Sequence, residues 1–338
     1  MPRSPSDAAS SDVATRAKSS SSSSATTRQT VQVGERRLAI SNLDKILYPQ
    51  TGFTKGGMLD YYARVAPVLL PHLAGRPLTR KRYPNGVDEQ PFFEKNAPRG
   101  TPEWVRTVTL PVPGSTKNRE TIDFVVVDEL ATLIWAANLA SIELHVPQWK
   151  VDRAGKALDA DLLVLDLDPG PPASIVECCE VALLLRDALR EDGVTAYPKT
   201  SGSKGMQLYA PLQPTPSDDA RDYARVLATR LEKARPHLIV SEMAKAVRHG
   251  KVFIDWSQNV AAKTTVAPYS LRARPEPTVS TPITWDEVSS CTTPEQLKFV
   301  AGEVLNRIEA DGDLLANLVT LPNSRRARLP MKARPAVR

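Results

Sequence analysis

The chain has 338 residues and a mass of 37.0 kDa, and its 41% of hydrophobic residues favours a globular protein over a disordered one. No stretch is apolar enough for a membrane span, and no apolar segment follows the first basic residues, so neither an anchor nor a secretory signal is predicted. The net charge of +6 resides in the ends, with +2 in residues 1–30 and +6 in residues 323–338, so residues 31–322 carry −2.

The two ends have the composition of tails, so the basic charge by itself does not indicate a nucleic-acid-binding fold. Residues 1–30 are rich in Ser, Ala and Thr and are predicted to be a disordered tail. Residues 323–338 are predicted to be a second mobile tail, which either solubilises the protein or binds phosphates non-specifically. Since no linker or repeat interrupts residues 31–322, we expect one continuous domain there.

The three cysteines, Cys178, Cys179 and Cys291, lack the spacing of a disulfide framework or of a metal motif. We therefore expect reduced thiols that pack in the core of an intracellular, cytoplasmic protein.

In chain order, the pattern predicts a helical turn at 41–44 and a helix at 57–70 that is interrupted near Pro67. A strand is expected at 121–127, followed by a helix that Asp128 caps. A buried strand at 162–168 precedes a helix at 174–191. Further strands are expected at 195–199, 206–211 and 252–255, with a helix at 217–233 whose Ser/Asp start supplies the cap. Hairpin-length gaps between several strands indicate an α+β fold with antiparallel or mixed sheets.

The segment LLVLDLDPG places Asp166 and Asp168 two residues apart at the end of an apolar strand. Their side chains then share one face, about 6–7 Å apart. Two such carboxylates resist burial unless a cation lies between them, and Mg²⁺ or Mn²⁺ prefers oxygen ligands. A solvated turn explains this common motif equally well. Asp255, at the end of another short apolar strand, would complete a set that holds two metal ions about 3.5–4 Å apart.

The segment KTSGSKG joins two predicted strands through a turn that contains Ser201, Ser203 and Lys204. Its glycines let backbone N–H groups approach an anion, and the serines and the lysine add donors and charge. The spacing is not that of a P-loop. By itself, the turn is equally consistent with a plain Gly/Ser hairpin.

Cations alternate with aromatic residues in three further segments, NLDKILYP…GFTKGG, TRKRYPNGV and FFEKNAP. This mixture suits a nucleic-acid strand, because phosphates bind cations and an unpaired base stacks on a ring. Adjacent phenylalanines such as Phe92 and Phe93 are more often core residues, so the stacking role depends on other support.

These segments, together with ELHVPQW, VFIDWSQN and APYSLRAR, occur in an order that resembles the polymerase domain of bacterial ligase D. That domain belongs to the archaeo-eukaryotic primase superfamily and serves non-homologous end joining. The resemblance covers roughly residues 31–322. It implies a primase-like α+β fold with mixed or antiparallel sheets and an RRM-like catalytic core flanked by helices. We find no K-x-D-G ligase motif, so a stand-alone polymerase is expected.

The resemblance also implies roles for individual residues. The catalytic, metal-binding set would be Asp166, Asp168 and Asp255. The nucleotide site would contain His145, Ser201, Ser203, Lys204, Gln207, Arg248, Gln258 and Arg272, with Gln207 standing where many members have a histidine. The DNA 5′-phosphate would bind Asn42, Lys45 and Lys55, and DNA would also contact Lys81, Arg82, Phe92 and Phe93, with Phe93 the preferred stacking residue. The insertion at residues 113–121 lies where the family has a hairpin loop that is implicated in bringing two ends together.

The function implied is a template-dependent nucleotidyltransferase that fills gaps at 5′-phosphorylated DNA ends, with two Mn²⁺ or Mg²⁺ ions and NTP or dNTP substrates, ribonucleotides preferred. Its expected partners are a Ku-type end binder and a separate ATP-dependent DNA ligase, and a monomer is expected that dimerises when two ends meet. A non-catalytic end-bridging module, a gap-filling polymerase of base-excision repair and a priming enzyme are the alternatives. The basic and aromatic segments disfavour a divalent-dependent nuclease or a sugar-nucleotide transferase.

Overall fold

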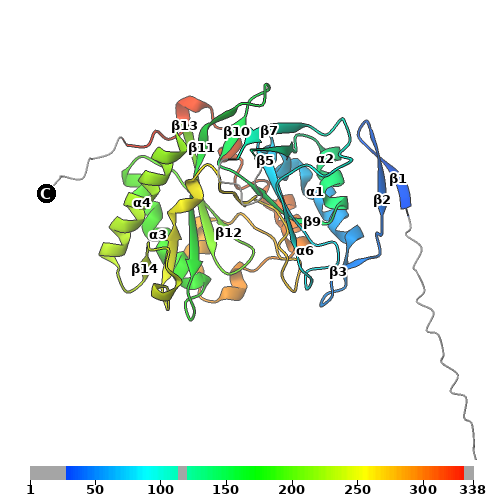
Figure 1. Ribbon diagram of the computed structural model, residues 1–338. Coiled ribbons are helices and arrows are strands. Elements are labelled where there is room, and N and C mark those ends of the chain that lie inside the picture. The colour runs from blue at the N-terminus through cyan, green and yellow to red at the C-terminus, as the bar shows by residue number, and fades with distance from the viewer. Residues whose placement is uncertain (1–27, 113–119, 331–338) are drawn as a thin grey trace, which may run out of the picture.

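The computed structural model of the protein describes residues 28–112 and 120–330, in which two six-stranded sheets lie side by side with their covering helices (Figure 1). The first sheet has the order β12-β13-β11-β15-β14, and β10 pairs with β11. All its pairs are antiparallel except β14 with β15. Its strands are β10 (Trp149–Val151), β11 (Ala157–Pro169), β12 (Tyr197–Thr200), β13 (Met206–Thr215), β14 (Ile239–Val240) and β15 (Val252–Asp255).

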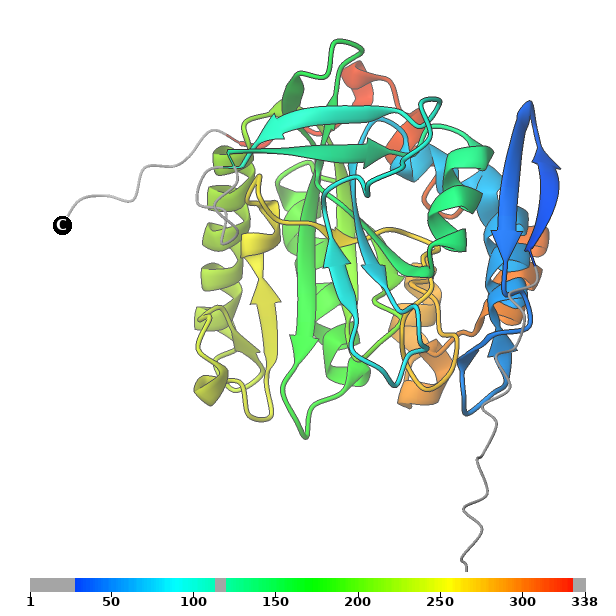
Figure 2. The same cartoon turned by 45° about the vertical axis from the view of Figure 1, so that its right-hand side comes forward.

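The second sheet is antiparallel and has the order β16-β9-β5-β8-β7, with β6 paired to β5. Its strands are β5 (Pro77–Arg82), β6 (Phe92–Glu94), β7 (Thr107–Pro111), β8 (Thr121–Val126), β9 (Ser141–Val146) and β16 (Thr265–Val266). Two hairpins precede it, β1 (Arg28–Val33) with β2 (Arg36–Ser41) and β3 (Ile46–Tyr48) with β4 (Phe53–Thr54). Figure 2 shows the first hairpin standing at the outer edge of the molecule. The expected α+β class with antiparallel and mixed sheets is confirmed.

Helices α3 (Ile175–Glu191) and α4 (Ser217–Ala234) cover one face of the first sheet, whereas α1 (Lys55–Leu73) and α2 (Leu130–Asn138) pack on the second. Near the carboxyl end, α5 (Trp285–Ser290) packs on α3, α6 (Ala301–Asp311) on α1, and α7 (Asn317–Thr320) on β13. No helix within residues 28–112 and 120–330 is long and apolar enough to cross a membrane.

Local signals explain why α3 begins where the sequence predicts. The Ser174 hydroxyl accepts the Val176 N–H, and the Glu177 carboxylate accepts the Ser174 N–H at 2.6 Å, which forms a capping box. Cys178 and Cys179 lie on its buried face and fill the core as expected, whereas Cys291 is half-buried.

Four local predictions are wrong. Helix α1 continues through Pro67, because the packing of its buried face outweighs the backbone hydrogen bond that a proline removes. No helical turn begins at Ser41, which ends β2, since Asn42 adopts a left-handed φ of 57°. Asp128 does not cap α2 but accepts the Gly75 N–H at 2.8 Å. Helix α4 has Pro216 at its N-cap, without a side-chain hydrogen bond.

The basic tail expected at residues 323–338 is in part packed on the domain. Arg326 is only 8% exposed, and its guanidinium donates to the carbonyl oxygens of Leu318 and Leu321, both at 2.9 Å. Ala327 donates its N–H to Pro211 O on β13. At the other end, β1 begins at residue 28, within the expected tail 1–30. Residues 28–30 and 323–330, which the sequence assigned to tails, are therefore part of the described structure.

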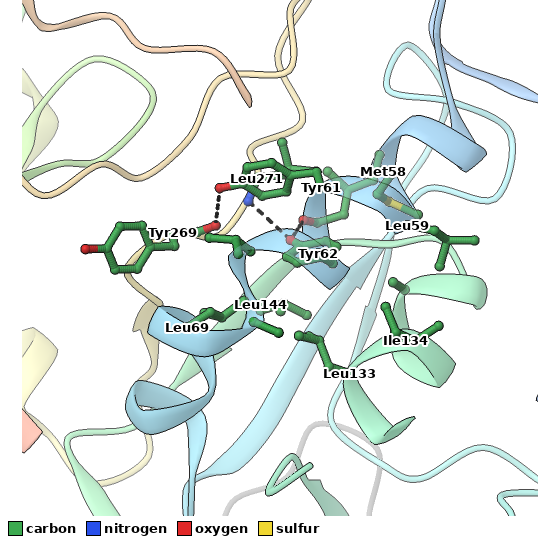
Figure 3. Packing of buried hydrophobic residues seen from close by; sticks show 14 of the residues in the cluster. Met58, Leu59, Tyr61, Tyr62, Leu69, Leu133, Ile134, Leu144, Tyr269 and Leu271 are labelled. Atoms are coloured by element: carbon green, nitrogen blue, oxygen red, sulfur yellow. Dashed lines mark hydrogen bonds between the residues drawn. The ribbon is translucent and has the colours of Figure 1, made fainter. Parts of the chain in front are cut away.

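Two tyrosines of α1 connect the helix to the second sheet and to the segment 269–271 (Figure 3). Tyr62 is fully buried, and its hydroxyl donates to Ile142 O at 2.6 Å and accepts the Leu271 N–H at 3.2 Å. The Tyr61 hydroxyl donates to Tyr269 O at 2.8 Å. The helix thus holds the segment around Leu271, which leads directly to the site described below.

We predict that Tyr62→Phe lowers the free energy of unfolding by about 1–3 kcal/mol, because it leaves a buried carbonyl and a buried N–H unpaired. Chemical denaturation of the two proteins measures this. Tyr197→Phe is the matched control, since the Tyr197 hydroxyl accepts a surface hydrogen bond from Asn317 and its loss should cost much less. Equal losses for both variants would contradict the prediction.

Candidate active site

One row of polar side chains crosses the first sheet. Asp166 on β11 pairs with Gln207 on β13 and with Asp255 on β15, and Lys199 on β12 pairs with Gln207. Directly paired residues of neighbouring strands project to the same face, so these four side chains lie on one face together with Asp168. The geometric prediction that Asp166 and Asp168 share a face is confirmed.

The opposite side of β11 is apolar, and Leu165 and Leu167 pack in the core beneath α3 and α4. The polar face is itself covered farther back along the strand, where Val164 and Tyr209 pack against Leu318 of α7. The carboxylates therefore begin where this apolar cover ends. The sheet thus presents them at the edge of the core rather than inside it.

The three carboxylates lie close together, and nearby positive charges do not fully balance their negative charges. Burial, then the neighbouring charges of Asp168 and Asp255, raise the pKa of Asp166 to about 7, although hydrogen bonding by Gln207 and the charge of Lys199 oppose this. Burial and the charge of Asp255 also raise the pKa of Asp168. Such a cluster of anions attracts a cation of high charge.

Asp255 is held by its own neighbours. Its carboxylate accepts the Ser257 N–H at 3.0 Å and the Gln258 side-chain amide at 2.8 Å. In the described residues, no three His, Cys, Asp or Glu side chains are arranged around one point as metal ligands. The donor set nevertheless fits a hard divalent cation, since three carboxylates supply oxygen ligands and excess negative charge.

The turn between β12 and β13 is shaped by its first serine and by two glycines. The Ser201 hydroxyl accepts the N–H groups of Ser203 and Gly205, at 3.2 and 3.3 Å. A Cβ at Gly205 would lie 1.9 Å from Leu167 O, and Gly202 has a φ of +66°, so both positions require glycine. Ser203 and Lys204 are exposed at the tip of the turn, where the Arg274 guanidinium donates to the Ser203 hydroxyl.

Two arginines border the carboxylates. The Arg248 guanidinium stacks 3.6 Å from the ring centroid of Phe253, which pairs with Asp168, and its charge partly opposes the rise in the pKa of that aspartate. Arg272 donates to Ser201 O and lies 3.4 Å from a Glu143 oxygen, so it connects the glycine–serine turn to the second sheet. Gln258, also predicted for the nucleotide site, donates its side-chain amide to the Asp255 carboxylate.

The second sheet contributes a face with cations and an aromatic ring. Phe93, Lys81 and Glu143 are paired across β6, β5 and β9, and His145 follows two residues after Glu143 on the same face. Phe93 is 54% exposed, and its ring centroid lies 6.3 Å from that of His145. This arrangement leaves a large part of the ring open for stacking.

Arg82 and Phe92 lie on the other face of the same strands. Arg82 donates to Leu139 O and to Glu94, both at 2.6 Å, so its guanidinium is committed to the protein. The structure therefore separates the two basic residues that the sequence places together, and Lys81 alone faces His145.

The candidate phosphate pocket forms at the start of α1. The turn at Asn42 packs on the first helical turn, with Lys55 N–H donating to Lys45 O at 2.8 Å and Gly56 N–H to Leu43 O at 2.8 Å. The Lys55 ammonium donates to Ser41 O at 2.7 Å. Burial and the charge of Lys45 lower the pKa of Lys55 to about 8, so the two ammonium groups lie close enough to repel.

Two residues of this region were missed by sequence reasoning, Lys199 and Glu143. Both are buried at the level of the site, with 0% and 2% exposure. Glu143 is a charged residue on the largely apolar strand β9, and Lys199 is the first residue of the KTSGSKG segment, so each had a signal in the sequence. The segment expected to act in end bridging, residues 113–121, lies largely outside the described residues.

An α+β fold that gathers carboxylates, a glycine–serine turn and a cationic, aromatic face is typical of enzymes that act on nucleotides. The profile of the family described as "LigD, primase-polymerase domain" matches residues 54–315, and the chain belongs to this family. This confirms the resemblance seen in the sequence.

Known proteins agree with this assignment. The "Multifunctional non-homologous end joining DNA repair protein LigD" of Mycobacterium tuberculosis is 46% identical over 290 residues, which are 84% of this chain and 37% of that protein. The "Bifunctional non-homologous end joining protein LigD" of Bacillus subtilis is 33% identical over 278 residues, 82% of this chain and 43% of that protein. The chain thus spans less than half of these relatives.

A solved structure extends the likeness to the fold. The polymerase domain of Mycobacterium tuberculosis ligase D, in complex with DNA, superposes with a TM-score of 0.80 and 45% sequence identity. The match covers 85% of this chain and 100% of that chain. The expected primase-polymerase fold is therefore confirmed.

We predict that Asp166→Asn stabilises the metal-free protein at pH 8 but not at pH 4. The Asp166 pKa is raised from 3.8 to about 7 by folding, so its contribution to stability is present below pH 4 and is lost as pH rises to 7. The amide carries no charge and escapes this loss. Melting temperatures in the presence of a chelator, measured across this pH range, test the sign.

The same variant tests cation binding. Added Mn²⁺ should raise the melting temperature of the parent protein at pH 8, because a ligand of the folded state stabilises it. Asp166→Asn should respond much less. A parent protein that is indifferent to Mn²⁺, or a variant that responds equally, would contradict a metal site at Asp166.

Proposed function

We propose that the protein is a template-dependent nucleotidyltransferase that fills gaps at 5′-phosphorylated DNA ends during non-homologous end joining. The observation that supports this most directly is the carboxylate row of Asp166 and Asp255, with Asp168, bordered by the glycine–serine turn. The second sheet faces this chemistry with a cation and an open aromatic ring. Both substrates, a nucleotide and a DNA strand, thus have matching groups.

Asp166, Asp168 and Asp255 would hold two Mn²⁺ or Mg²⁺ ions, which supply activation of a 3′-hydroxyl and stabilisation of a leaving pyrophosphate. Ser203 and Lys204, at the tip of the turn, bind the phosphates of the incoming nucleotide. Gln207, which is buried and hydrogen-bonds to Asp166, adds no positive charge there, unlike the histidine of many relatives.

The template side depends on Phe93 and Lys81. An exposed ring stacks on an unpaired base, a contact worth roughly 1–3 kcal/mol that tolerates any base. Lys81 supplies charge for the backbone. Since these two residues are paired on neighbouring strands, base and phosphate contacts are held at a fixed spacing.

The 5′-phosphate binds at the start of α1. This helix has 19 residues, and its amino terminus presents the positive end of the helix dipole, although the N–H groups of Lys55, Gly56 and Gly57 already donate to Lys45 O, Leu43 O and the Thr54 hydroxyl. Lys45 and Lys55 add two ammonium groups, and Asn42 adds a hydrogen bond. A terminal phosphate carries more charge than an internal one, so the pocket selects broken or gapped ends.

A Ku-type end binder and a separate ATP-dependent ligase would act with this protein in end joining. Gap filling in base-excision repair uses the same 5′-phosphorylated gap, so the same site could serve that repair pathway as a second candidate function. Joining of two broken ends by purified Ku-type protein and ligase, with and without this protein, distinguishes the two settings.

We predict nucleotide incorporation on a gapped duplex, with ribonucleotides used roughly tenfold better than deoxynucleotides. A hydrogen bond to the 2′-hydroxyl in a desolvated site is worth about 1 kcal/mol or more, and the site loses it with a deoxynucleotide. Asp166→Ala combined with Asp168→Ala is the inactive control and should still bind DNA. A preference for deoxynucleotides would refute the first statement, and extension by the control would refute the carboxylate assignment.

We predict that Lys45→Ala with Lys55→Ala removes the advantage of 5′-phosphorylated gaps but spares extension of a simple primer–template. Lys233→Ala, an exposed lysine of α4, is the matched control. Since Lys55 has a pKa of about 8, the advantage of the phosphate should decline as pH rises past 8, where the lysine loses its charge. Relative rates on the two gaps from pH 6.5 to 9.5 measure both effects. An undiminished advantage in the double variant would place the phosphate elsewhere.

A further inference from the structure

Glu143 is a buried carboxylate at the centre of the second sheet, only 2% exposed. One oxygen accepts the Ala273 N–H at 3.1 Å and lies 3.4 Å from Arg272 Nε and 3.8 Å from Lys81 Nζ. The other oxygen is 2.9 Å from His145 Nε2. A single side chain thus contacts groups from three segments of the site.

The carboxylate is ionised despite its burial. Burial raises the pKa of Glu143, but the hydrogen bond with His145 and the charges of Arg272 and Lys81 outweigh it and bring the pKa well below its usual range. A buried charge is retained only where such partners exist, because desolvation alone would neutralise it.

The three partners need this anion in turn. Lys81 and Arg272 carry like charges and sit within 4 Å of the same oxygen, so they repel each other without it. Arg272 also donates to Ser201 O, which links Glu143 to the glycine–serine turn on the first sheet. One carboxylate therefore fixes the position of groups on both sides of the site.

We propose that Glu143 is a positioning residue that holds Lys81, His145 and Arg272 in the geometry that nucleotide and template require. This inference rests on the proposed function. Glu143 acts through these three side chains and makes no contact with substrate of its own.

Glu143→Gln tests this, because it keeps the size of the side chain and removes the charge. The KM for the nucleotide should rise at least tenfold and template affinity should fall a few-fold, with a smaller change in kcat. Glu143→Asp, which keeps the charge, should recover part of the loss. The losses of Glu143→Gln and Arg272→Gln should not add in the double variant, since the two act as one unit.

Glu287→Gln is the matched control for lost stability. Glu287 on α5 also pairs with an arginine, with Oε1 2.7 Å from Arg307 Nη1, and lies outside the site. The Glu287→Gln variant should have a lower melting temperature and an unchanged KM for the nucleotide. If both variants change KM in proportion to the stability they lose, Glu143 is merely structural and the inference is overturned.

The pKa of His145, measured by NMR, tests the role of Glu143 without a catalytic assay. His145 is one of four histidines, so its imidazole can be assigned in an NMR titration with a His145→Gln reference. Burial lowers the His145 pKa, and Arg272 and Lys81 lower it further, whereas Glu143 raises it; the Phe93 ring adds no charge. Glu143→Gln should therefore shift this pKa downward, and Glu287→Gln should not.

The outcomes separate the two proposals. A parent protein without incorporation activity contradicts the proposed function, while the His145 titration and calorimetric binding of NTP still decide the role of Glu143. Unchanged His145 titration and unchanged NTP affinity in Glu143→Gln overturn the inference, even if the parent protein is an active polymerase.

Discussion

The register of β11 between β13 and β15 is the constraint on which the site depends. It pairs Asp166 with Gln207 on one side and with Asp255 on the other. A shift by one residue would turn the aspartates into the core under α3 and would expose Leu165 and Leu167. Packing of the apolar residues on one face of the first sheet therefore fixes the positions of the aspartates on the other face. A change of register would disrupt the core and the carboxylate cluster together.

The site is built from charges that the protein does not fully neutralise by itself. The negative charges of the three aspartates destabilise one another on the first sheet. On the second sheet, the single negative charge of Glu143 is surrounded by several positively charged groups. The carboxylates lower the stability of the metal-free fold, and the proposed binding of divalent cations would account for their retention. Arg272 bridges the two regions, and the α1 tyrosines secure the segment that carries it. Core packing, charge placement and recognition are thus connected through a few side chains.

Short-range signals in the sequence were reliable where a side chain acts on its own backbone. The capping box of Ser174 and Glu177 marked the start of α3, and β15 has the bounds that its apolar run predicted. Two of the errors occurred where contacts with distant segments decide the local structure. Pro67 is tolerated because the buried face of α1 is packed, and Asp128 is drawn away from its helix by Gly75 and Arg106. No local pattern contains those partners.

The sequence by itself determined the class of fold, the family and the shared face of Asp166 and Asp168, because these follow from ordered motifs and from the two-residue period of a strand. Only the tertiary structure decided that Asp255 lies beside Asp166 and that Lys81 faces the site while Arg82 does not. It also revealed Lys199 and Glu143 as buried charges of the site. Pairing between strands far apart in the chain, and the burial that results, sets the position and charge state of these groups, and neither is encoded in the spacing of neighbouring residues.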